Sequence, residues 1–131
     1  MMETDNKLPL ILYAEDSLMD IELTMNAFEG SNIQSRLGLV RDGQELLDYL
    51  RYEGIYTKRT KETPCVILLD NKMPRLSGLE TLKIIKSDPD LRYIPVVMMT
   101  SSKLNSDLID SYNYGVNAYV QKPVDMEQFI V

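Results

Sequence analysis

The 131-residue sequence contains no histidine and no tryptophan, and it has a single cysteine, Cys65. Without histidine, the commonest general base and the commonest zinc ligand are both excluded from any site in this chain. One cysteine cannot form an internal disulfide, so the fold does not depend on an oxidising compartment. These absences exclude histidine-based hydrolysis and disulfide-stabilised secreted scaffolds.

Long hydrophobic runs are also absent. The longest apolar runs have five or six residues, whereas a membrane-spanning helix needs about 20. The N-terminal stretch MMETDNKLPLILYAED has no basic n-region and is interrupted by acids and by Pro9, which is unlike a signal peptide. We therefore expect a cytoplasmic protein that does not associate with membranes.

The composition is that of an ordinary globular domain. Hydrophobic residues make up 44% and charged residues 26% of the chain, and the formal net charge is −6. A domain with this charge is repelled by nucleic-acid phosphates and by anionic lipids, so we expect no nucleic-acid binding. The length suits one core, so residues 1–131 are predicted to form one domain.

Short apolar segments alternate with amphipathic ones along the chain. Strands are predicted at Leu8–Ala14, Leu37–Val40, Cys65–Leu69, Val96–Met99 and Ala118–Gln121. Helices are predicted at Ser17–Glu29, Gln44–Tyr52, Leu79–Ile85 and Ser106–Tyr114, and from Met126 onward. The first helix carries apolar residues at Leu18, Ile21, Met25 and Phe28, whose spacing places them on one face of a helix. This alternation indicates an α/β fold, a parallel sheet with helices on both faces.

The loop before the third predicted strand and the single cysteine are expected to have no chemical role. The loop Glu53–Thr63 is polar and basic, and we interpret Lys58, Arg59 and Lys61 as a solvated face. Cys65 is predicted to be a core residue.

Polar residues follow the predicted strands at their carboxyl ends. Glu15 and Asp16 follow the first strand, Asp70 the third, Thr100 the fourth and Lys122 the fifth. Ligands of open parallel sheets bind just beyond these ends. Three crowded carboxylates favour a divalent cation with oxygen ligands, Mg²⁺. A cation, an ammonium and a hydroxyl together suit a phosphoryl group, with Asp70 as the carboxylate nucleophile that forms an aspartyl phosphate.

The sequence resembles the receiver domain of two-component response regulators. The resemblance is carried by ILYAED, VILLDNKMPRLSG, IPVVMMTSS and AYVQKP, which begin at residues 11, 66, 94 and 118. It implies a flavodoxin-like (βα)5 three-layer sandwich with a five-stranded parallel sheet of order 2-1-3-4-5. Within the family, the long basic loop, DPDLRYIPVVMMTSS and YGVNAYVQKP are most similar to the phytochrome-associated single-domain regulators.

The resemblance implies a role for each matching residue, within a signalling phosphoacceptor that is not an enzyme in the ordinary sense. Asp70 corresponds to the phosphoacceptor and is also a metal ligand, and Lys122 pairs with the phosphoryl group. Glu15 and Asp16 correspond to the acidic pair that positions Mg²⁺, and the backbone carbonyl of Lys72 would be a further ligand of the metal. Thr100 corresponds to the switch hydroxyl, and Tyr119 corresponds to the aromatic switch. The Lys122–Pro123 peptide is predicted to be cis.

The resemblance also implies partners. A sensor histidine kinase, of the phytochrome type, would donate the phosphoryl group, and the downstream protein is not identified. The last helix has about two turns before Val131, so we expect it to be cut short. Such receivers often pair through this helix, which leaves open whether the chain forms a homodimer.

Several alternatives were weighed. A flavin-binding module would need a first turn rich in phosphate donors, but this turn is EDSLMD. An aspartate-nucleophile phosphatase would need a second acid at position 72, which is lysine. A receiver-like interaction module that works without phosphorylation stays open as the alternative function. At single residues, Asp70 could be a helix N-cap, and Tyr119 could simply pack in a strand.

Overall fold

The computed structural model describes residues 8–100 and 114–122. Its strands are β1 (Leu10–Ala14), β2 (Arg36–Val40), β3 (Val66–Asp70), β4 (Val96–Thr100) and β5 (Ala118–Gln121). Its helices are α2 (Leu18–Glu29), α3 (Gly43–Arg51) and α4 (Gly78–Ser87), with one 3₁₀ turn, η1 (Gly54–Tyr56). The predicted helix at 106–114, the helix from Met126 and the Lys122–Pro123 peptide fall wholly or mainly outside the described residues.

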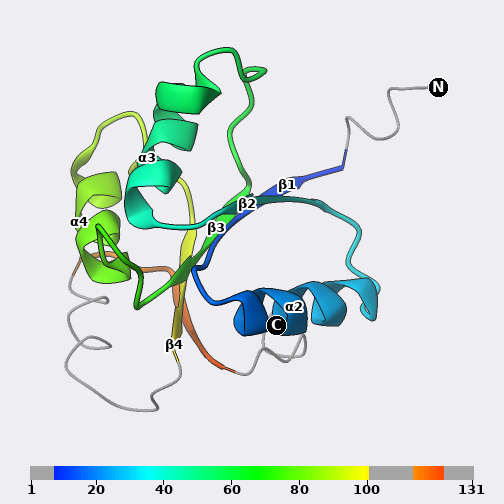
Figure 1. Cartoon of the computed structure of the whole chain (residues 1–131). Coiled ribbons are helices and arrows are strands. Elements are labelled where there is room, and N and C mark those ends of the chain that lie inside the picture. Colours follow the sequence, from blue (N-terminus) through cyan, green and yellow to red (C-terminus); the bar gives the residue numbers. More distant parts are fainter. Residues whose placement is uncertain (1–7, 101–113, 123–131) are drawn as a thin grey trace.

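The strands form one parallel sheet of order β2-β1-β3-β4-β5. Helix α2 lies on one face of this sheet, and α3 and α4 lie on the other (Figure 1). The predicted α/β class, three-layer arrangement and strand order are therefore confirmed. Because every strand runs the same way, all five carboxyl ends meet at one edge of the sheet.

Alternation along the strands divides the core in two. Odd residues of β1, such as Tyr13, pack with α2, and even residues, such as Leu12, pack with α3 and α4. On β3 and β5 the even residues Leu68 and Val120 face α2. The sheet is thus covered on both sides, which explains its nearly continuous apolar strands.

The helix boundaries follow from capping. Ser17 caps α2, Asp42 caps α3 and Ser77 caps α4, each accepting a hydrogen bond from the backbone three residues on. Strand β1 begins at Leu10 rather than Leu8, and β3 extends to Asp70. Each described helix is too short and too polar to cross a bilayer.

Leu18, which shares its predicted helix face with Ile21, is 68% exposed, because it lies in the first turn of α2 and the buried face begins at Ile21. One residue-level prediction was wrong. Cys65 is exposed rather than buried, because it precedes β3 instead of forming part of it.

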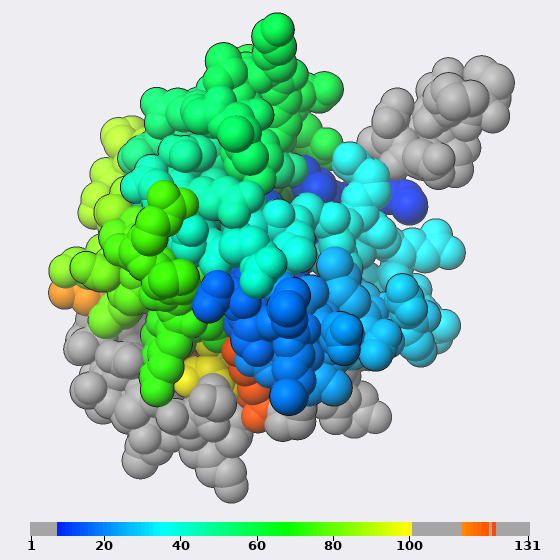
Figure 2. Space-filling model, viewed as in Figure 1, coloured from blue at the N-terminus to red at the C-terminus, as the bar shows by residue number. Residues whose placement is uncertain are grey.

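The loop at residues 53–63 was also misjudged in part. The Arg59 guanidinium lies between the rings of Tyr49 and Tyr52, 3.8 and 4.3 Å from their centroids. It donates to the main-chain oxygens of Tyr49 at 2.9 Å and of Glu62 at 3.1 Å. Arg59 is therefore a structural residue that organises the loop, which projects from the top of the molecule in Figure 2.

Candidate functional site

Strand alternation brings three charged side chains to the same face and the same edge of the sheet. Glu15 continues the odd positions of β1, and Asp70 and Lys122 continue the even positions of β3 and β5. All three therefore point to the α2 side at the carboxyl edge. Their convergence follows from strand order and parity, two properties of the whole sheet.

The Lys122 amine lies at the centre of this group. Its Nζ is 2.6 Å from Asp70 Oδ1 and 2.8 Å from Glu15 Oε1. The exposed fractions of the three side chains are 11% for Lys122, 6% for Asp70 and 1% for Glu15. Burial alone lowers the pKa of Lys122, but hydrogen bonds to the surrounding carboxylates outweigh it and raise that pKa, so the amine stays charged.

A further carboxylate, Asp20, was missed from the sequence. Its Oδ2 lies 2.7 Å from Lys122 Nζ, and its side chain is 31% exposed. Asp20 stands three residues after the N-cap Ser17, a position from which an acid often caps its own helix. Here Glu15 Oε2 accepts from the Ser17 N–H at 3.3 Å. The position of Asp20 in the sequence therefore predicts a capping role at the start of α2. Only the tertiary structure shows that its carboxylate contacts Lys122.

Asp70 is the last residue of β3 and is not the cap of the next helix. Ser77 caps α4 in a reciprocal capping box with Glu80, which disposes of the N-cap alternative for Asp70. Burial is the main cause that raises the pKa of Asp70 from 3.8 to about 6, with the Glu15 charge adding to it and Lys122 opposing it. At neutral pH the carboxylate is therefore mainly ionised but poorly solvated.

Gly78 allows the chain to pass close to Asp70. A Cβ at this position would lie 2.2 Å from the Asp70 carbonyl oxygen and 2.9 Å from the Asn71 Cα. These neighbours are backbone atoms, which cannot move aside as a flexible side chain can. The close approach of α4 to the end of β3 therefore requires glycine at position 78.

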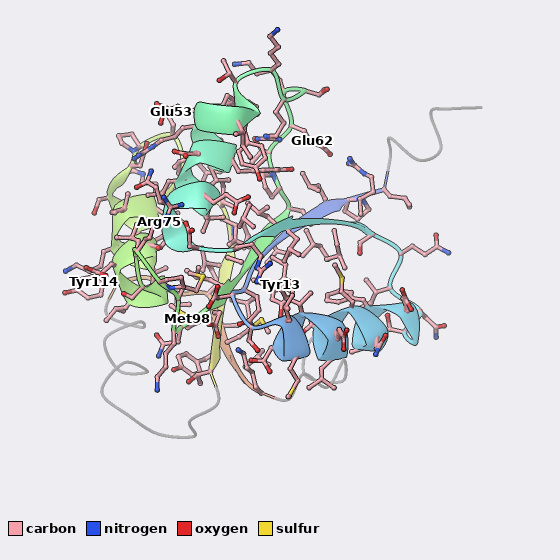
Figure 3. All side chains as sticks on the ribbon, in the orientation of Figure 1. Tyr13, Glu53, Glu62, Arg75, Met98 and Tyr114 are labelled. Atoms are coloured by element: carbon pink, nitrogen blue, oxygen red, sulfur yellow. The ribbon has the colours of Figure 1, made fainter. Side chains whose placement is uncertain are left out.

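The two loops beside the group are braced from the start of α3. The Arg41 guanidinium donates to the main-chain oxygen of Asp16 at 2.8 Å. Arg75, labelled in Figure 3, donates to both carboxylate oxygens of Asp42 at 2.8 and 2.9 Å. One segment, residues 41–42, thus holds the loop after β1 and the loop after β3.

A cavity of about 220 Å³ opens beside these groups. It is lined by Glu15, Asp16, Ser17, Asp20, Asp70, Asn71, Lys72, Thr100 and Lys122. Figure 2 shows the ends of β4 and β5, in yellow and red, between α2 in blue and the green segment after β3. Asp16 and Lys72 are exposed, whereas Asp70 and Thr100 are buried. The structure thus brings the predicted pocket residues into one cavity.

The donor set suits a hard cation. The cavity lining includes four acidic residues and two lysines, a formal balance of two negative charges. Within residues 8–100 and 114–122, no three acidic side chains stand close enough together to hold a metal ion, and the Lys122 amine contacts Glu15 and Asp70 directly. The chemistry of the residues fits a divalent cation with oxygen ligands.

Thr100 and Tyr119 lie on the other side of the sheet. Met98 and Tyr119 are partners in the β4–β5 register, and both pack in the core that faces α3 and α4. Thr100 is two residues after Met98 in β4, so its side chain lies on the same side of the sheet as that of Met98. Thr100 is the last residue of β4 and also lines the cavity. The two residues predicted to act together are therefore on one face.

Comparisons with known proteins agree with this geometry. Rcp1 of Synechocystis sp. is 38% identical over 122 residues, which cover 93% of this chain and 82% of Rcp1. The solved structure of the bacteriophytochrome response regulator RtBRR is 50% identical, with a TM-score of 0.86 over 94% of this chain and 74% of that one. The phosphorylated cyanobacterial phytochrome response regulator RcpA is 39% identical, with a TM-score of 0.80 over 92% and 85%.

A Mn²⁺-bound form of Rcp1 is also similar, at 37% identity and a TM-score of 0.79 over 92% of this chain and 85% of that chain. The predicted likeness to phytochrome-associated regulators is confirmed. The model of the response regulator receiver domain matches residues 11–131. The chain therefore belongs to the receiver domain family of two-component signalling proteins.

Proposed function

We propose that the receiver unit, predicted from the sequence to span residues 1–131, accepts a phosphoryl group on Asp70 with Mg²⁺ bound beside it, in the cytoplasm. The observation that carries the proposal is the buried Asp70 carboxylate, 2.6 Å from the Lys122 amine at the wall of a polar cavity. A buried carboxylate with one fixed cation is poorly solvated and therefore nucleophilic.

In the proposed transfer, a carboxylate oxygen of Asp70 attacks the phosphorus of a phosphohistidine. The new O–P bond forms as the N–P bond breaks, and the electron pair stays on the imidazole nitrogen. Lys122 already touches Asp70 Oδ1, so its ammonium is placed to pair with the added phosphoryl oxygens. The main-chain N–H of Lys72 also donates to the Asp70 carboxylate and helps to orient it.

Mg²⁺ would be held by the carboxylates of Asp16 and Asp70, with Glu15 beside them and the main-chain oxygen of Lys72 completing the protein ligands. When bound, it would neutralise charge on the phosphoryl oxygens during transfer. Asp16 suits this role because it is exposed at the cavity mouth and its loop is fixed by Arg41. The Mn²⁺ in the similar Rcp1 structure supports a divalent site of this kind.

The signal would then pass through Thr100 and Tyr119. Movement of the Thr100 hydroxyl toward the phosphoryl group would open space on the face where Tyr119 packs, because both residues lie on that face. A change in the Tyr119 rotamer would alter the surface around β5, where a downstream protein would bind. The simpler alternative is that Tyr119 only packs in its strand and does not change rotamer.

A sensor histidine kinase would dock beside the cavity. Leu18, Met19 and Leu23 on α2 are 68%, 71% and 47% exposed. Three large apolar side chains on one short helix suit a partner helix. Because the similar proteins are named as phytochrome response regulators, we propose a kinase of the phytochrome type. Alanine at Leu18 and Met19 should slow transfer from such a kinase and leave labelling by acetyl phosphate unchanged.

The proposal is tested by intact mass after incubation with acetyl phosphate, with and without Mg²⁺. We expect one added phosphoryl group that requires Mg²⁺ and disappears in Asp70→Asn. Asp90→Asn, which removes an exposed carboxylate at the opposite edge, is the matched control and should label normally. No added mass on a folded sample would refute the proposal and favour the phosphorylation-independent interaction module.

A further inference from the structure

Tyr13 is a buried polar residue of the ILYAED segment to which neither the sequence analysis nor the proposed phosphoryl transfer assigns a role. It lies in β1 on the side of the sheet that α2 covers, near the start of that helix (Figure 3), and its side chain is fully buried. A buried phenol hydroxyl needs hydrogen-bond partners. The partners that Tyr13 has are informative because one of them belongs to the cavity.

The Tyr13 hydroxyl contacts Thr24 Oγ1 at 3.0 Å, Glu15 Oε1 at 3.2 Å and, at a longer 3.4 Å, the Asp20 main-chain oxygen. Glu15 is acceptor-only when ionised, so Tyr13 must be the donor in that bond. Its single proton is then used, and Thr24 must donate to the Tyr13 oxygen. The result is a directed relay from Thr24 through Tyr13 to Glu15, in which Thr24 and Glu15 are each 1% exposed.

Glu15 has other donors on the remaining sides. The Ser17 N–H contacts Oε2 at 3.3 Å, and Lys122 contacts Oε1 at 2.8 Å. Lys122 is shared with Asp20 and Asp70, so it must redistribute when a phosphoryl group or a cation arrives. The hydroxyl of Tyr13 and the Ser17 N–H are fixed by β1 and by the helix cap, and they hold Glu15 throughout.

We propose that Tyr13 is a positioning residue, whose hydroxyl, oriented by Thr24, fixes the Glu15 carboxylate for the divalent cation. This inference rests on the proposed metal-dependent function. Partners of this kind, which touch a metal-site carboxylate and not the metal, set the orientation and basicity of that carboxylate. Burial raises the pKa of the Tyr13 phenol, so it remains a donor across the physiological range.

The test is a titration of the full chain with Mn²⁺ alone, following free Mn²⁺ by electron paramagnetic resonance. Tyr13→Phe keeps the buried ring and should weaken Mn²⁺ binding by roughly tenfold. Thr24→Val removes only the first donor of the relay and should weaken binding by less. In acetyl phosphate labelling, Tyr13→Phe should raise the half-saturating Mg²⁺ concentration and leave the rate at saturating Mg²⁺ nearly unchanged.

Tyr52→Phe is the matched control. The Tyr52 hydroxyl also makes two hydrogen bonds, both to the Glu62 main chain. Tyr52 directly follows the last residue of α3 and does not line the cavity that holds Glu15. This variant should lose comparable stability and bind Mn²⁺ as the wild type does. Wild-type affinity in Tyr13→Phe, or an equal loss in Tyr52→Phe, would overturn the relay while leaving the proposed function intact. Absence of Mn²⁺ binding by the wild type would refute the proposed function itself.

Discussion

Replacing Asp70 with asparagine should stabilise the metal-free, unphosphorylated protein. The Asp70 side chain is only 6% exposed, and Glu15 shares its Lys122 partner. Burial, with the Glu15 charge, raises the Asp70 pKa from 3.8 to about 6. The folded state thus holds at neutral pH a carboxylate that ionises more easily in the unfolded chain, and asparagine removes this cost.

The magnitude and its pH dependence follow from the two pKa values. The difference between 3.8 and about 6 corresponds to about 3 kcal/mol of unfolding free energy above pH 6. As the pH falls through 6, the folded wild type takes up a proton that the unfolded chain does not, so the cost shrinks. It should be about half as large at about pH 5 and nearly absent at about pH 3.8.

Urea unfolding in the presence of EDTA, followed by circular dichroism at about pH 7.5 and about pH 5, measures this difference. We expect Asp70→Asn to be more stable than the wild type by about 2–3 kcal/mol at the higher pH, since the amide oxygen still accepts from Lys122. Asp90→Asn should change stability by less than about 0.5 kcal/mol at either pH. An Asp70→Asn variant that is no more stable than the wild type at the higher pH would refute the assigned burial cost, as would a gain that does not change with pH.

Three further substitutions test other parts of the structure. Gly78→Ala should destabilise the fold by about 2–3 kcal/mol in urea unfolding and also reduce acetyl phosphate labelling, because the new methyl group displaces the backbone of Asp70; normal labelling would contradict this. Arg59→Ala should cost about 2 kcal/mol through the lost contacts to the ring and carbonyl of Tyr49, with no change in labelling rate. Lys122→Met should lower the free energy of unfolding by about 3 kcal/mol at about pH 7.5, because it leaves buried carboxylates without their cation. The loss should diminish toward about pH 5, since the carboxylates can then take up protons. A loss that grows as the pH falls would contradict this explanation.

The differences between sequence-based expectation and structure are local ones. The spacing of Leu18 and Ile21 matched one helix face, but Leu18 lies in the first turn of α2 and is exposed there. Arg59 stands in a basic run that resembles a solvated loop, yet its guanidinium packs on the rings of Tyr49 and Tyr52 at the end of α3. Hydrophobic periodicity and charge describe a segment, and they do not describe what packs against it.

The site shows the same division between what a motif predicts and what packing decides. Asp70, Glu15 and Lys122 could be chosen from the sequence because each follows an apolar strand. Asp20 and Tyr13 could not, since an acid in the first turn of a helix and a tyrosine within a strand have ordinary local explanations. The contacts of Asp20 with Lys122 and of Tyr13 with Thr24 depend on where α2 lies against the sheet.

The sequence by itself determined the α/β class, because the alternation of apolar strands and amphipathic helices is a property of short segments. It also determined which polar residues stand at the ends of the strands. The strand order was predicted from the resemblance to the receiver family. Only the tertiary structure decided that the Lys122 ammonium, directly after β5, reaches carboxylates that follow β1, end β3 and lie in α2. The most distant pair, Lys122 and Glu15, is 107 positions apart in the sequence. Strand order and the alternation of side chains in the assembled sheet bring such residues together.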